Sequence, residues 1–152
     1  MTALDAWLAL PLLRQSGTAY MLVNAAHILG LGLLVGAILP LDLRLVGLFR
    51  AAPLTVLGPF LSRTAAVGLA LALATGALLF TVRPSEYLGN PAFLAKLGLL
   101  SAALVNVALQ HTDGVRAAYA DGAVTAGARV KAGFSLLLWL GVLVAGRAIG
   151  FA

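Results

Sequence analysis

The chain has 152 residues, of which 62% are apolar and 10% charged, and its mean hydropathy is +1.04. A soluble domain carries about a quarter charged residues and could not bury so much apolar surface at this length, so the composition indicates an integral membrane protein. The net charge of +5 comes from scattered basic residues, which argues against nucleic-acid binding, and the lack of cysteine excludes disulfides and thiolate metal sites.

Four apolar stretches, each with a long run free of charged residues, predict membrane-spanning helices over residues 17–41, 61–82, 91–111 and 130–151. A helix rises about 1.5 Å per residue, so about 20 residues cross a hydrocarbon layer of about 30 Å. Before them, residues 2–14 are typical of a short interfacial helix with Trp7 at headgroup level. We therefore expect one all-α transmembrane domain over residues 1–152, an integral membrane four-helix bundle.

The segments between the spans carry their own signals. Asn90 and Pro91 form a strong helix start, and Pro84 closes the second span. The segment 45–60 contains two prolines and is interpreted as a half-embedded connector. The segment 112–128 is small and polar, and it is expected to be the longest aqueous loop.

Basic residues predict the orientation in the membrane. Arg14 and Arg83 flank one side, whereas the connections on the other side carry Arg44, Arg50, Arg63, Arg116, Arg129 and Lys131. Basic residues accumulate on the cytoplasmic side of membrane proteins. The pattern therefore predicts that both termini face away from the cytoplasm.

Small residues recur at four-residue spacing, which allows helix backbones to approach closely. They are Gly32 and Gly36, then Gly68, Ala72 and Gly76, then Gly146 and Gly150. Such stripes favour tight packing within the bundle. They could also pack against another subunit, and the sequence leaves both uses open.

His27 is predicted to lie about 15 Å deep in the first span. Tyr20 and Asn24 share its helical face, and Gly30 leaves room one turn beyond for a flat group. A buried imidazole beside glycine suits axial ligation of haem iron. The alternative is a neutral histidine hydrogen-bonded inside the bundle.

Lys96 and Arg147 are expected in the same half of the membrane as His27. Two cations between a histidine ligand and the interface would suit the anionic propionates of a haem. Taken singly, each could instead extend its charged end to the headgroups. The grouping of His27, Lys96 and Arg147 in one half of the membrane favours a haem site.

His111 ends the third span, about 15 Å from the expected depth of His27. Two axial ligands must reach the same iron, so this pair is not expected to hold one haem. His111 is either a ligand at a second metal site or an interfacial histidine at a helix C-terminus.

Several sequence blocks resemble an uncharacterised family of small bacterial four-helix membrane proteins with an A-H-x-L-G … D-L-R-L first helix. The blocks are residues 24–30, residues 42–45, residues 90–93, Lys96, Asn106 and His111. A more distant similarity is to the haem-b-binding membrane protoporphyrinogen oxidase and to copper-resistance-D-like proteins. That similarity implies haem binding through His27, with Arg44 and Lys96 at the positions of an arginine and a lysine of the oxidase. A further histidine of the oxidase after that arginine is missing here.

The main hypothesis, given this resemblance, is a haem-b-binding subunit that takes part in electron transfer in the lipid bilayer of the bacterial inner membrane. Both termini would be periplasmic, and no catalytic residue is assigned. The predicted cofactor-binding residues are His27, Lys96, Arg44, Arg147 and Asn24, and the predicted metal ligands are His27 and His111. The alternative is a cofactor-free accessory or assembly subunit of a larger membrane complex, or a homo-oligomer. A transporter of small solutes or metal ions is less favoured, because membrane acids are scarce and no internal repeat is visible.

Overall fold

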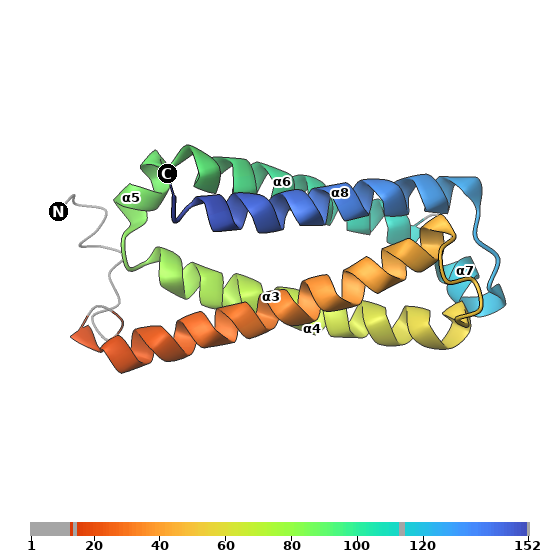
Figure 1. Cartoon of the computed structure of the whole chain (residues 1–152), viewed down its shortest axis with the longest axis horizontal. Coiled ribbons are helices and arrows are strands. Elements are labelled where there is room, and N and C mark those ends of the chain that lie inside the picture. The colour runs from red at the N-terminus through yellow and green to blue at the C-terminus, as the bar shows by residue number, and fades with distance from the viewer. Residues whose placement is uncertain (1–12, 14, 113–114, 152) are drawn as a thin grey trace.

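The computed structural model describes residue 13, residues 15–112 and residues 115–151, and all regular elements in these ranges are α-helices. Four long helices, α3 (Gly17–Val46), α4 (Leu54–Phe80), α6 (Pro91–Thr112) and α8 (Ala126–Ala148), make up most of the molecule (Figure 1). Each is long and apolar enough to cross a membrane. The predicted all-α fold is confirmed, and the four apolar helices support the predicted multi-pass membrane protein. The predicted interfacial helix over residues 2–14 lies outside the described residues except for Leu13.

The first two spans are longer than predicted, because prolines do not end them. Pro40 lies inside α3 and Pro59 inside α4. Proline removes one backbone hydrogen bond, which a membrane helix tolerates when neighbouring groups satisfy the freed carbonyl. The segment 45–60 is therefore mostly helical. Helix α3 ends where Gly47 adopts a φ of +121°, and α4 begins at Leu54.

The connections contain two short helices, α5 (Pro84–Gly89) and α7 (Val115–Asp121). The expected aqueous loop over 112–128 thus includes a helix, and α7 packs against α4. Ala118 is fully buried, and a methyl group on Gly58 of α4 would overlap the ring of Tyr119. Gly58 therefore lets α7 cover one end of the bundle.

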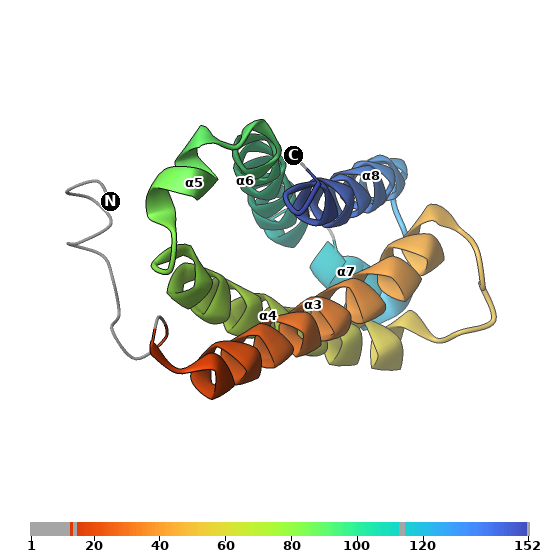
Figure 2. The ribbon, with the colours of Figure 1, turned by 60° about the vertical axis from the view of Figure 1, so that its left-hand side comes forward.

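The long helices form two antiparallel pairs, α3 with α4 and α6 with α8. Helix α3 also packs against α8, whereas α4 and α6 make little direct contact. The pairs lie close together at the α7 end and diverge toward the end that holds α5 (Figures 1 and 2).

Two glycines bring the backbones of α3 and α4 into contact. A Cβ atom at Gly30 would lie 2.7 Å from the Ala72 nitrogen, and one at Gly68 would lie 2.5 Å from the Leu34 nitrogen. Such distances leave no room for a side chain. By contrast, a Cβ atom at Gly32 or at Gly36 would have no neighbour within 4 Å. The small-residue stripe of α4 therefore packs inside the chain, and the stripe of α3 does not.

The core at mid-bundle joins both helix pairs. It is a cluster of buried side chains from α3, α4, α6 and α8, namely Leu34, Ala37, Ile38, Ala65, Ala103, Trp139 and Val142. Large apolar side chains such as Ile28, Leu137 and Val144 face outward and are more than half exposed. An apolar exterior of this kind suits hydrocarbon as the surrounding solvent.

Candidate functional site

A cleft of about 550 Å³ lies between the diverging helix pairs, with side chains from α3, α4, α5, α6 and α8 along its walls. Its lining is mostly leucine, alanine and phenylalanine, and its titratable lining residues are His27 and Lys96. Small-molecule sites typically measure about 300–1,000 Å³ and combine apolar walls with a few polar groups. We call this space the His27 cleft.

The His27 ring is oriented by α4. Its Nδ1 lies 3.0 Å from Thr75 Oγ1, and that hydroxyl donates to the Leu71 carbonyl oxygen at 2.6 Å. Because the hydroxyl hydrogen is used there, Thr75 Oγ1 accepts from His27 Nδ1–H. The Ala72 carbonyl, a second acceptor, also lies near the ring. These partners assign the proton to Nδ1 and leave a lone pair on Nε2.

Thr75 and Gly76 together make this arrangement possible. A Cβ atom at Gly76 would lie 3.2 Å from His27 Cε1, so glycine lets the imidazole lie close to α4. Sequence reasoning looked for companions of His27 on its own helix and did not identify Thr75. The available signal was a threonine within an apolar span, directly before a glycine of the small-residue stripe.

Lys96 enters the cleft from α6. Its side chain lies along Gly146 of α8, where a Cβ atom would be 3.5 Å from Lys96 Nζ. Within the described part of the chain the ammonium group makes no hydrogen bond or ion pair, and it lies within electrostatic range of His27. The structure thus brings together His27 and Lys96, two of the predicted site residues.

Asn24 and Arg147 do not line the cleft. Asn24 is exposed on α3, one turn before His27. Arg147 is exposed near the end of α8, where its guanidinium lies 4.3 Å from the centroid of the Phe151 ring. Arg147 therefore lies at the same end of the bundle as α5 but outside the site.

Arg44 lies at the opposite end of α3, about 25 Å from His27 along the helix axis. It donates to the carbonyl oxygens of Ala52 at 2.7 Å and Arg50 at 3.0 Å. These bonds hold the connection between α3 and α4. The structure does not bring Arg44 to the His27 cleft.

His111 also lies far from the cleft, in agreement with the expectation that it does not share a haem with His27. It is exposed near the end of α6, and its Nδ1 lies 2.9 Å from the Val107 carbonyl oxygen. Over residues 15–112 and 115–151, no group of three or more His, Cys, Asp or Glu side chains could hold a metal ion. In the described ranges, His111 therefore does not belong to a three-ligand cluster of these residue types.

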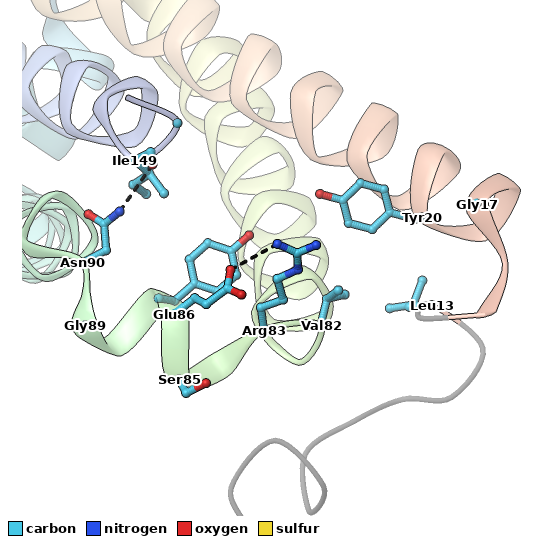
Figure 3. A pocket seen from close by; sticks show the side chains of 12 residues that line it. Leu13, Gly17, Tyr20, Val82, Arg83, Ser85, Glu86, Gly89, Asn90 and Ile149 are labelled. Carbon is cyan, nitrogen blue, oxygen red and sulfur yellow. Dashed lines mark hydrogen bonds and ion pairs between the residues drawn. The ribbon is translucent and has the colours of Figure 1, made fainter. Parts of the chain in front are cut away.

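A larger pocket of about 1030 Å³ lies at the α5 end of the bundle (Figure 3). Here Arg83 and Glu86 form an ion pair at 3.2 Å, and Asn90 Nδ2 donates to the Ile149 carbonyl at 3.3 Å. Both ion-pair partners are about two-thirds exposed, so the pair contributes little to stability. The Asn90 bond ties the start of α6 to the end of α8.

An aromatic cluster borders both the end pocket and the His27 cleft. The rings of Phe80 and Phe93 are stacked with centroids 5.6 Å apart, and Tyr87 lies 5.3 Å from Phe93. Phe80 and Phe93 line the cleft, whereas Tyr87 lines the end pocket. Burial raises the pKa of the Tyr87 hydroxyl. The cluster joins α4, α5 and α6 where α4 and α6 make little other contact.

The fold and the cleft define a helical multi-pass membrane protein with an oriented histidine beside an apolar opening. Comparisons of the chain with protein-family models, curated proteins and solved structures give no match.

Proposed function

We propose that this chain binds haem b in the His27 cleft and serves as an electron-transfer subunit in the membrane. The observation that supports this most is the hydrogen bond from His27 Nδ1 to Thr75 Oγ1. Histidines that ligate metals nearly always donate their other ring N–H to an acceptor, which fixes the tautomer and the ring orientation. His27 has this arrangement, and it borders an apolar cleft of about 550 Å³.

The residues of the cleft fit the chemical parts of a haem. His27 Nε2 would ligate the iron, and the aliphatic and aromatic walls would cover the porphyrin. Lys96 would pair with a propionate, because a cation in an apolar setting stabilises a carboxylate strongly. When bound, haem supplies one-electron redox chemistry; the chain holds it, orients His27 through Thr75 and excludes water.

The bacterial inner membrane, with both termini in the periplasm, is part of the proposal. The basic side chains of Arg44, Arg50, Arg129 and Lys131 belong to the end of the bundle that holds α7. The excess of basic residues at that end favours its placement in the cytoplasm. The His27 cleft would then lie in the periplasmic half of the membrane.

The test is an absorption spectrum of the purified full chain, recorded oxidised and dithionite-reduced, together with iron analysis. We expect a Soret band and b-type reduced bands in the wild type and in Asn24→Ala, which alters an exposed residue on the same helix. His27→Ala should lose them. A wild-type protein without a Soret band and without iron, even after haem is supplied during expression, would rule out the proposal.

The alternative proposal is a cofactor-free accessory or assembly subunit of a larger complex. It draws support from the exposed, unpacked glycines Gly32 and Gly36 on α3. It expects a larger partner to copurify with the chain, and a His27→Ala, Lys96→Ala double variant to assemble with that partner normally. Loss of assembly in the double variant would count against it.

A further inference from the structure

A second cavity, of about 130 Å³, lies at the opposite end of the bundle from α5. Five helices contribute to its walls, and several of the lining side chains are polar. These polar residues are Asp42 of α3, Ser62 of α4, Gln110 and His111 of α6, Tyr119 of α7, and Ser135 and Trp139 of α8. We call it the Asp42 cavity.

Two buried groups that line this cavity have no protein partner in the described ranges. They are Asp42 Oδ2, in a residue that is 2% exposed, and Gln110 Nε2, in a residue that is 8% exposed. Trp139 Nε1 is likewise buried without a partner, and Trp139 lines both the Asp42 cavity and the His27 cleft. A buried polar group without a hydrogen bond costs about 1–3 kcal/mol, and a charged one costs more.

The chemistry of these groups indicates what fills the cavity. Asp42 offers an acceptor when ionised, whereas Gln110 offers a donor. A water molecule can accept from the amide and donate to the carboxylate, so it satisfies both. Ser135 hydrogen-bonds to the Asp42 carboxyl, so Oδ2 is the carboxyl oxygen left for water. Each water takes a share of about 30 Å³, so the cavity has room for several of them.

We propose that the Asp42 cavity holds a cluster of water molecules that joins Gln110 to Asp42, and that Asp42 takes up and releases a proton through this cluster. The exit to solvent is at His111, which lines the cavity and is exposed. Ionisable residues at membrane depth are expensive and typically mark proton or ion pathways. This proton site is separate from haem binding, because it lies at the other end of the bundle.

The groups that face Asp42 limit what else can titrate there. On α7, burial raises the pKa of Tyr119 to about 12. The nearby Asp42 carboxyl also raises this pKa, whereas a hydrogen bond with Ser62 lowers it. Tyr119 therefore stays neutral at physiological pH. The lining residues from α4 and α8 do not titrate, and α6 contributes His111, whose Nδ1 is engaged by Val107. Among the described lining residues, Asp42 is thus the buried acid that can exchange a proton with the cluster.

Infrared difference spectroscopy of the full chain in liposomes tests the proposal. A protonated carboxyl absorbs apart from a carboxylate, and the chain has only five acidic residues. We expect a pH-dependent carboxyl band that is absent in Asp42→Asn and present in Asp121→Asn, which changes an exposed acid. In D2O the band should shift promptly, because a hydrated carboxyl exchanges its proton.

A milder variant keeps the test informative if Asp42→Asn does not fold. Gln110→Leu leaves Asp42 in place and removes the amide donor, so the midpoint of the Asp42 band should rise by about one pH unit, a tenfold change in proton affinity. Wild-type protein labelled with ¹³C-carboxyl aspartate separates the aspartate bands from Glu86. A carboxyl band that never changes with pH, or one that does not shift in D2O, would overturn the proposal.

Discussion

His27 Nδ1 and Thr75 Oγ1 lie 3.0 Å apart although the two residues come from different membrane-spanning helices. The Thr75 hydroxyl can accept this bond because its hydrogen is donated to the Leu71 carbonyl within α4. The bond therefore fixes the histidine tautomer and ties the ring to the wall of the cleft. The account of haem binding depends on this relationship.

Replacing Thr75 with valine should weaken haem binding by about 10–100-fold, the usual cost of removing a group that orients a metal ligand. Valine keeps the shape of the side chain but cannot accept from Nδ1–H. The measurement is haem affinity by absorption titration. Thr64→Val is the matched control, because Thr64 makes the same type of bond, to the Phe60 carbonyl, on an exposed part of α4. Equal affinities for both variants would contradict the orienting role.

Replacing Lys96 with glutamine should lower haem affinity, because the propionate loses its charged partner in the cleft. Arg44→Gln should leave haem affinity unchanged, since Arg44 lies at the other end of α3. It should instead lower the free energy of unfolding by about 1–3 kcal/mol through loss of its bonds to the loop carbonyls. If Arg44→Gln lowered haem affinity and Lys96→Gln did not, Lys96 would not be the partner of the propionate.

Adding a methyl group at Gly30 should destabilise the packing of α3 on α4, because the new atom would lie 2.7 Å from the Ala72 nitrogen. Overpacking of this kind costs about 1–3 kcal/mol. Gly32→Ala is the control, since no atom lies within 4 Å of that position, and it should be neutral or stabilise the helix by up to about 1 kcal/mol. Unfolding in mixed detergent micelles measures both. Similar losses of unfolding free energy in Gly30→Ala and Gly32→Ala would contradict the close contact of α3 with α4 at Gly30.

Stability should fall in alkaline solution as Tyr119 ionises. Its pKa in the folded chain is raised to about 12 from an ordinary value of 10.0, so the folded state holds this proton more tightly than the unfolded state. The stabilising contribution is complete below pH 10 and is lost as the pH rises toward 12. Tyr119→Phe should flatten this part of the curve of melting temperature against pH. An alkaline slope that is the same in Tyr119→Phe and in the wild type would contradict this assignment.

The sequence predicts the fold well because hydrocarbon imposes a simple requirement on length and polarity. The starts at Gly17 and Pro91 agree with the predicted starts. The start of α4 at Leu54 differs from the predicted start at residue 61, because proline suggests a connector whereas a membrane helix tolerates Pro59. Helix α7 was not predicted because it is only seven residues long and its packing depends on the distant Gly58.

The candidate site was only partly predictable, for reasons of geometry. His27 and Lys96 were identified because ionisable groups in apolar spans are costly. Thr75 was not, since helical periodicity relates residues on one helix and says nothing about the facing helix. Likewise, the sequence cannot show that Asp42 and Gln110 line one cavity, because they lie on α3 and α6, which are separated along the chain by α4 and α5.

Titration of the purified, haem-free chain with haemin, followed by Soret absorbance, tests the central claim most directly. The account predicts saturable binding of one haem per chain by the wild type, and loss of the ligated Soret band in His27→Ala with the helical fold retained by circular dichroism. If His27→Ala gives the same saturable spectrum as the wild type, the imidazole is not the iron ligand and the haem proposal for this cleft is wrong.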